Sequence, residues 1–158
     1  MAEKIQIIVP EAYPQMLNKS DAARAVLMLR APETRAKAEA AARSYAAPMR
    51  AAILKYVSEM EQAGDDIAQI FAKVHEIRGF ADTAGLFTTG RISKILCRYI
   101  DDMERIQRPM EPNLVMLHVA AIARAARAEE GDMATGEAVA AELAALVARR
   151  LEEAAGSR

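Results

Sequence analysis

The stretch of sequence that decides the fold is DDIAQIFAKVHEIRGFADTAG, residues 65–85. Apolar residues recur in it at helical spacing and form one stripe. The members of this stripe are Ile67, Ile70, Phe71, Val74, Ile77 and Ala81. Asp65 or Asp66 is a suitable N-cap for such a helix, and Gly85 suits a left-handed cap at its other end. The pattern therefore predicts an amphipathic helix that buries one face.

The segments on both sides of this stretch also have helical patterns. Before it, Pro32 suits a first helical turn, Pro48 indicates either a kink or a new helix, and Gly64 ends the segment. Four further apolar stripes predict the helices that surround it. These are Ile53, Val57 and Met60; Ile92, Ile95, Leu96, Tyr99, Ile100 and Met103; Leu114, Leu117, Ala121 and Ile122; and Val139, Leu143, Leu146, Val147 and Leu151. Because the connections are short, neighbouring helices are expected to pack antiparallel.

Together these helices predict an all-α fold. Its core is expected to be an antiparallel up-and-down four-helix bundle at residues 31–130, with extra flanking helices. Residues 1–30 are expected to form an N-terminal extension, in which residues 5–10 are extended in character and residues 22–29 form a short amphipathic piece. Residues 131–158 are expected to carry a C-terminal helix, which begins after a loop at residues 131–136 and packs on or beside the bundle.

Composition and charge exclude several classes of protein. Hydrophobic residues make up 53% of the chain and charged residues 27%, which is enough for a folded core. A net charge of -1, with 4% aromatic residues and no Trp, argues against a nucleic-acid partner. No apolar run approaches the roughly 20 residues of a membrane-spanning helix. The single cysteine, Cys97, excludes an internal disulfide and fits a reducing compartment, so we expect a cytoplasmic protein without a membrane partner.

Two kinds of site find little support in the residues. Residues 85–92 have the glycine spacing of a phosphate-binding loop but lack its Lys-Ser/Thr ending, and no strand precedes them. His75, Cys97 and His118 fall on three successive predicted helices, whereas zinc sites usually have ligand pairs at short spacing. We therefore expect neither a metal nor a cofactor. Cys97 is better explained as a small buried apolar residue, and His118 as a core or boundary histidine.

His75 is the candidate functional residue. At about 100° of rotation per residue, it falls at the edge of the buried face of its helix. Arg78 and Gly79 follow on adjoining surface, and an arginine there can neutralise a phosphoryl group carried by the imidazole. A glycine inside a helix costs about 1 kcal/mol relative to alanine. We interpret Gly79 as opening access to the ring for a bulky partner.

The residues from His75 to Gly85 resemble the signature H-x-x-[KR]-G-x-x-x-x-x-G of histidine-containing phosphotransfer (HPt) domains. Residues 91–99 are similar to the next helix of small stand-alone HPt proteins, and the resemblance covers roughly residues 35–130. It implies that His75 receives a phosphoryl group from a receiver-domain aspartate and passes it on, through the ring nitrogen distal to the backbone. It also implies a phosphocarrier rather than an enzyme, with response-regulator receiver domains and a hybrid histidine kinase as partners.

Phe80 and Asp82 depart from the family's pattern, in which small residues are frequent at these positions. Asp82 follows Arg78 by four residues, so the two side chains can meet on one helix face. In that arrangement Asp82 would orient Arg78. Alternatively, it would repel a phosphoryl group and an acidic receiver pocket. We favour the pairing.

Three basic residues, Arg91, Lys94 and Arg98, recur at positions i, i+3 and i+7 of the following helix. They form either a solvated face or a basic rim that steers an acidic receiver domain toward His75. Two further functions stay open beside the phosphocarrier. One is a non-phosphorylated scaffold that binds signalling partners, and the other is a dimerisation module built on the alanine-rich last helix.

Overall fold

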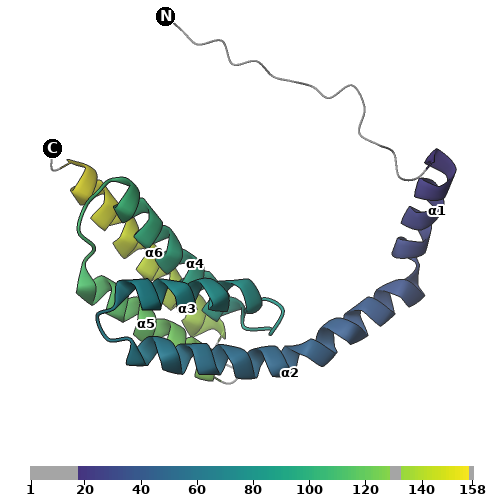
Figure 1. The fold of residues 1–158 in the computed structure, drawn as a ribbon, viewed down its shortest axis with the longest axis horizontal. Helices are drawn as coiled ribbons and strands as arrows, with labels where there is room; N and C mark the ends of the chain where they lie inside the picture. Colours follow the sequence, from purple (N-terminus) through teal and green to yellow (C-terminus); the bar gives the residue numbers. More distant parts are fainter. Residues whose placement is uncertain (1–17, 129–132, 157–158) are drawn as a thin grey trace, which may run out of the picture. The chain divides into compact units, whose positions relative to one another are not determined.

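The computed structural model describes residues 18–128 and 133–156, and all regular structure in these ranges is helical (Figure 1). The helices of this part of the chain are α1 (Lys19–Arg30), α2 (Pro32–Gln62), α3 (Ile67–Phe80), α4 (Phe87–Arg105), α5 (Pro112–Arg127) and α6 (Met133–Gly156). The predicted all-α class is confirmed for these residues. The extended piece predicted at residues 5–10 lies outside them. By its contacts the chain divides into two units, after Ala41.

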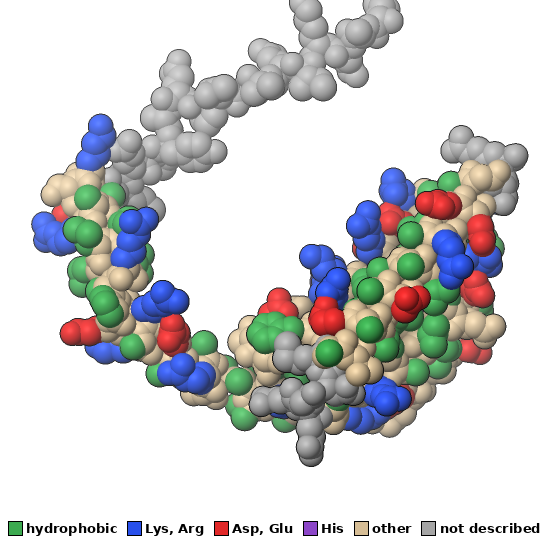
Figure 2. Space-filling view, turned by 180° about the vertical axis from the view of Figure 1, so that it is seen from behind, with side chains coloured by type: hydrophobic (Ala, Val, Ile, Leu, Met, Phe, Trp, Pro, Cys, Tyr) green, Lys and Arg blue, Asp and Glu red, His purple; other side chains and the backbone are tan. Residues whose placement is uncertain are grey.

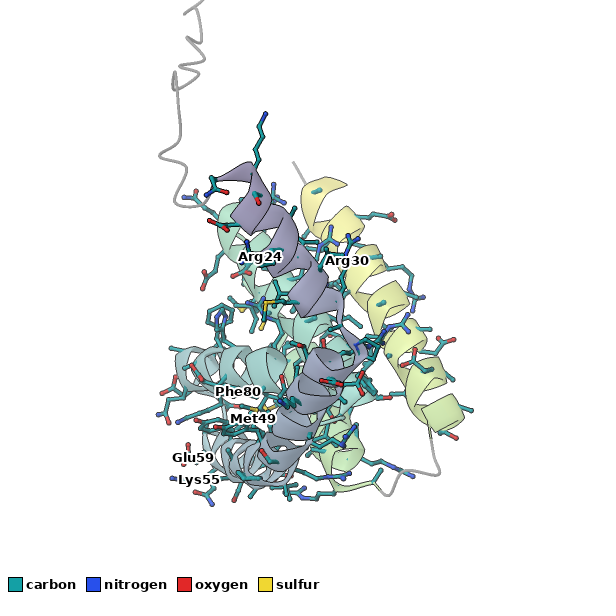
Figure 3. All side chains as sticks on the ribbon, turned by 90° about the vertical axis from the view of Figure 1, so that its right-hand side faces the viewer. Arg24, Arg30, Met49, Lys55, Glu59 and Phe80 are labelled. Atoms are coloured by element: carbon teal, nitrogen blue, oxygen red, sulfur yellow. The ribbon has the colours of Figure 1, made fainter. Side chains whose placement is uncertain are left out.

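The first unit contains α1 and the beginning of α2. The Asn18 side chain caps α1 by accepting a 2.9 Å hydrogen bond from the backbone N–H of Asp21. Ala31 is extended and ends α1, and Pro32 then opens α2 as a first-turn proline. The predicted amphipathic piece is thus a helix, yet no residue of α1 is buried. Arg24 and Arg30 project from it (Figure 3).

Helix α2 continues through Pro48. A proline has no N–H to donate to the carbonyl one turn earlier, which weakens a helix at that point. Because α2 is nevertheless continuous across Pro48, the predicted alternative of a new helix that starts there is wrong. Beyond it, Ile53, Val57 and Met60 are buried, as their spacing predicts.

Buried residues from α2 to α6 form one core in the second unit. The largest fully buried side chains include Tyr99, Ile53, Met60, Ile70, Ile77, Ile92 and Leu96. Helix α4 is central, since it packs against α3, α5 and α6, and α5 also contacts α6. On the face seen in Figure 2, acidic and basic side chains are interspersed over this unit. No described helix combines the length and apolar character needed to cross a bilayer.

The predicted stripes of α5 and α6 were partly wrong. Leu117 is 48% exposed and Val139 is 39% exposed. In α5 the buried face is turned toward Val115, His118 and Val119, because the helix packs against α4 and α6 at once. Because the polar residue His118 lies at the centre of that face, a pattern based on apolar residues alone does not identify the face that is buried.

Gly85 closes α3 as predicted. The backbone N–H of Leu86 donates to the carbonyl of Ala81 at 2.8 Å, and that of Gly85 donates to the carbonyl of Asp82 at 3.1 Å. This is the Schellman pattern, which places Gly85 in the left-handed region, at φ +73°. The cap turns the chain directly into α4.

The end of α4 has the same pattern around a residue other than glycine. Arg108 N–H donates to the carbonyl of Met103, and Gln107 N–H donates to that of Glu104, both at 3.0 Å. Gln107 therefore holds the left-handed position, at φ 53°. A side chain with a Cβ atom is strained in this conformation.

Helices α4 and α6 approach closely at Gly136. A Cβ atom on Gly136 would lie 2.7 Å from the Cγ2 atom of Thr88, which real contacts do not allow. The predicted loop at residues 131–136 is therefore wrong at its end, because α6 already begins at Met133. Gly136 serves helix packing inside α6 rather than ending a loop.

Ion pairs fasten the end of α2 to its neighbours. Lys73 of α3 lies 2.6 Å from the Glu59 carboxylate, and Arg127 of α5 makes two hydrogen bonds to Glu61, at 2.8 and 2.5 Å. Lys55, one turn before Glu59, joins the first pair (Figure 3). These contacts hold α2 beside α3, the helix that carries His75.

Candidate functional site

His75 lies exposed on α3, between the buried residues Val74 and Ile77. Its ring packs at a tilt of 52° against Phe71, with 6.0 Å between the ring centroids. Phe71 is half-buried against the core and supports one side of the imidazole. The ring thus stands at the edge of the buried face, where the helical spacing places it, and is open to solvent and to a partner.

Arg78 contacts His75 directly. Its Nη2 atom lies 3.3 Å from the Nδ1 atom of the His75 ring. A guanidinium can only donate hydrogen bonds, so Nδ1 is the acceptor, and the proton of the neutral imidazole is on Nε2. The contact is long and exposed, which leaves Arg78 free to exchange it for a stronger acceptor.

Gly79 faces open space. A Cβ atom built on it has no neighbour within 4 Å beyond the adjacent helical backbone. Packing therefore does not explain the absence of a side chain at this position. The glycine leaves a low surface one turn after His75, as the access interpretation requires.

Asp82 does not pair with Arg78 in the described part of the chain. Arg78 reaches back to His75, whereas Asp82 lies beyond the end of α3. One Asp82 carboxylate oxygen would lie 3.2 Å from a Cβ atom built on Gly90, so Asp82 borders the start of α4. The pairing favoured from the sequence is wrong, because the closing turn of α3 carries Asp82 toward α4.

The three basic residues of α4 differ in their surroundings. Arg91 forms an ion pair with Glu137 of α6, and Arg98 lies 3.5 Å from Asp102 one turn along α4. Lys94 is exposed and makes no ion pair with any described residue. Only Lys94 thus offers an unshared positive charge at this rim.

Cys97 and His118 lie beneath the surface. Burial raises the pKa of the Cys97 thiol to about 11, and the positive charge of Arg78 opposes this shift. His118 is 0% exposed, and its Nδ1–H donates to the carbonyl of Leu114 at 2.8 Å. Burial lowers the pKa of His118, so the ring is held neutral. Neither residue is accessible to a partner, and no described cluster of His, Cys, Asp and Glu could hold a metal ion.

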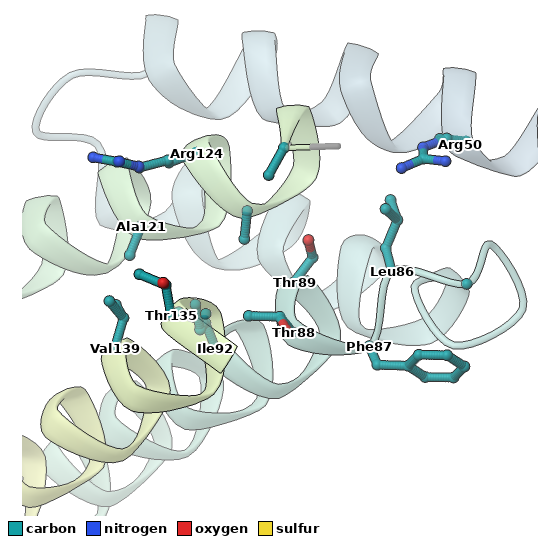
Figure 4. Close-up of a pocket in the computed structure, with 14 residues that line it drawn as sticks. Arg50, Leu86, Phe87, Thr88, Thr89, Ile92, Ala121, Arg124, Thr135 and Val139 are labelled. Atoms are coloured by element: carbon teal, nitrogen blue, oxygen red, sulfur yellow. The ribbon is translucent and has the colours of Figure 1, made fainter. Parts of the chain in front are cut away.

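Sequence reasoning missed a cavity at the start of α4. Residues 85–89, discounted as a phosphate-binding loop, line it together with residues from α2, α5 and α6 (Figure 4). The glycine spacing did not indicate this cavity, because Gly90 serves the close packing of α4 against Ala81. A Cβ atom there would lie 3.0 Å from the Cβ atom of Ala81.

Comparisons with family models, curated proteins and solved structures found no match to this chain. The residues around His75 are therefore the features of the chain that point to a function. They offer one exposed imidazole, an exposed cation in contact with it and open surface beside both. This arrangement suits the transfer of an anionic group to and from a ring nitrogen.

Proposed function

We propose that the protein is a histidine phosphotransfer protein, which relays a phosphoryl group between response-regulator receiver domains in a multistep two-component phosphorelay. One observation carries the proposal: exposed His75 has Arg78 on its ring and open space at Gly79. The resemblance of this segment to the HPt signature supports it. In this proposal α2 to α5 act as an antiparallel four-helix bundle, with α1 and α6 as flanking helices.

The transfer step uses the lone pair of one ring nitrogen. In the family that the sequence resembles, this is Nε2, which would attack the phosphorus of an aspartyl phosphate. The N–P bond forms as the P–O bond to the aspartate breaks, and the aspartate leaves as a carboxylate. The reaction runs in the opposite sense when the phosphoryl group passes to the next receiver domain.

Arg78 must move for this step to occur. In the structure it donates to Nδ1, which keeps the imidazole proton on Nε2 and blocks the lone pair of that atom. Attack through Nε2 requires the proton on Nδ1 instead. An incoming phosphoryl group is a better acceptor for Arg78 than a neutral ring nitrogen, so its arrival releases Nδ1. The exposed ring then gives its Nε2 proton to water and takes a proton from water on Nδ1, which frees the Nε2 lone pair for attack. Arg78 then neutralises charge on the phosphorylated product.

The surroundings of the His75 ring also explain why the proposed transfer needs a partner. The helix around His75 supplies one cation and an exposed ring, with no described acid or base in contact with the imidazole. The receiver domain must therefore bring the reactive phosphate and align it. The protein acts as a carrier in a cytoplasmic pathway that begins at a hybrid histidine kinase.

The test is labelling by a phosphorylated receiver domain. We expect the parent protein and His118→Gln to gain an acid-labile phosphate, and His75→Gln to gain none while it remains folded. An exposed edge residue contributes little packing, so His75→Gln should keep the parent's circular dichroism spectrum. Equal labelling of His75→Gln and the parent would refute the proposal and favour a scaffold that is not phosphorylated.

A further inference from the structure

A cavity of about 120 Å³ lies where the beginning of α4 meets α2, α5 and α6. Arg50, Leu86 and Phe87 border one end of it, and Ala121, Thr135 and Val139 border the other (Figure 4). All of these residues belong to the second unit of the chain. Most of the wall is apolar, and the polar side chains in it are Arg50, Thr88, Thr89, Arg124 and Thr135. Two of these, Thr88 and Thr89, lie at the start of α4, and Arg50 faces the same end (Figure 4).

The first of these polar features is the N-terminal end of α4. Leu86 is the N-cap residue, and no side chain caps the helix there. The first backbone N–H groups of α4 therefore keep their donor capacity, and the helix dipole makes this end positive. Together they favour an acceptor with negative charge.

Thr89 provides an independent observation at the same place. The residue is 1% exposed, and its Oγ1 atom has no hydrogen-bond partner. The hydroxyl points from α4 into the space bordered by Leu86, Arg50 and α5 (Figure 4). A buried hydroxyl without a partner destabilises a fold, so a ligand that accepts its hydrogen bond would remove this cost.

Arg50 supplies the charge. It is half-buried on α2 and makes no ion pair with any described residue. In Figure 4 its guanidinium is directed toward Leu86, at the end of the cavity where α4 begins, whereas the guanidinium of Arg124 points away from that end. Arg50 is thus the cation that a ligand at Thr89 would meet.

We propose that this cavity is a binding site for a short-chain organic carboxylate. The carboxylate lies at the start of α4, where Thr89 and Arg50 donate to it, and its apolar chain extends along Ile92, Ala121 and Val139. Apolar cavities of about 150 Å³ hold a molecule the size of benzene, so a volume of about 120 Å³ suits an apolar chain of about five carbons, with the carboxylate outside this volume at the N-terminal end of α4.

The experiment titrates the full-length protein with hexanoate and follows binding by calorimetry and by NMR shifts of the amides of residues 87–89. We expect saturable binding that moves these amides, with affinity at least tenfold weaker for hexan-1-ol, which lacks the charge. Acetate, which lacks the chain, should also bind at least tenfold more weakly. Hexanol that binds as tightly as hexanoate, or no saturable binding of hexanoate at millimolar concentration, would overturn the proposal.

Three variants assign the contacts. Arg50→Gln should lower hexanoate affinity about tenfold and Thr89→Val about threefold, whereas Lys55→Gln, which removes a charge from the same helix, should leave it unchanged. Thr89→Val also removes an unpartnered hydroxyl, so its thermal midpoint should be equal to or higher than that of the parent. Unchanged affinity in Arg50→Gln or in Thr89→Val would refute the site, and an equal loss in Lys55→Gln would show attraction by net charge alone.

Discussion

At the scale of single residues, a substitution at Gly79 shows whether this glycine gives a partner access to His75 or serves helix packing. Because a Cβ atom there meets nothing within 4 Å, Gly79→Ala should raise the free energy of unfolding by up to about 1 kcal/mol. The same variant should slow phosphotransfer, since it narrows the approach to His75. Thermal midpoint and transfer rate measured together test this, with Gly136→Ala as the control that must lose stability. A less stable Gly79→Ala with normal transfer would make Gly79 a packing residue.

Arg78 is the other residue whose role can be isolated. Arg78→Ala should shorten the lifetime of phosphorylated His75 or slow transfer by roughly tenfold, because a charge-assisted hydrogen bond is lost. Arg78→Lys keeps the charge and should retain much of both. The exposed position predicts unchanged folding for both variants. Identical decay and transfer rates in Arg78→Ala and the parent would leave Arg78 without a part in the chemistry.

At the scale of secondary-structure elements, the two Schellman caps differ in the type of residue at the left-handed position. Gln107 has a φ of 53° where α3 has Gly85 at +73°. Gln107→Gly should therefore stabilise the protein by about 1 kcal/mol, because it removes left-handed strain. Gly85→Ala introduces the same strain and should destabilise it by a similar amount. Urea titrations of both variants measure this, and a loss of stability in Gln107→Gly would show that the Gln107 side chain has a compensating role.

At the scale of the whole molecule, His118 couples folding to pH. Burial lowers its pKa in the folded protein, whereas the unfolded chain has the ordinary value near 6.5. Between these two values the unfolded state binds the extra proton, so stability is full above about pH 7 and falls as the pH drops below about 6.5. The slope can reach about 1.4 kcal/mol per pH unit from one histidine. Chemical denaturation from pH 7 to pH 5 measures it.

The matched variant for this measurement is His118→Gln. The His118→Gln variant should flatten the pH dependence, because it removes the group whose pKa is lowered by burial. The lowered pKa values of Glu59 and Glu61 also cost stability in acid, because the folded carboxylates resist protonation. Their effect begins only as the pH approaches about 4.5, below the histidine window. A parent slope that survives in His118→Gln would assign it to other groups.

The sequence was sufficient for the features that depend on local periodicity. The stripe of α3, its Gly85 cap and the edge position of His75 all follow from residues close in the chain. The close approach of Gly136 to Thr88 depends on how α4 and α6 cross, which no local pattern contains. The direction of Arg78, toward His75 rather than Asp82, depends on the turn that follows α3. The cavity at Thr89 is lined by residues from four helices, so the spacing of residues within one helix does not predict it.

The ion pair between Arg91 and Glu137 has a consequence for the kinetics of association. It neutralises one cation of the expected rim. The other charged side chains of α4, three basic and three acidic, sum to a net charge of zero. In the proposed phosphorelay, long-range attraction to an acidic receiver domain then depends mainly on Lys94. Raising the ionic strength from 0.05 to 0.5 M, across which the Debye length falls from about 14 to about 4 Å, should slow association only a few-fold. Stopped-flow mixing with a receiver domain would measure this, and the recognition that remains at high salt would come from short-range contacts around His75.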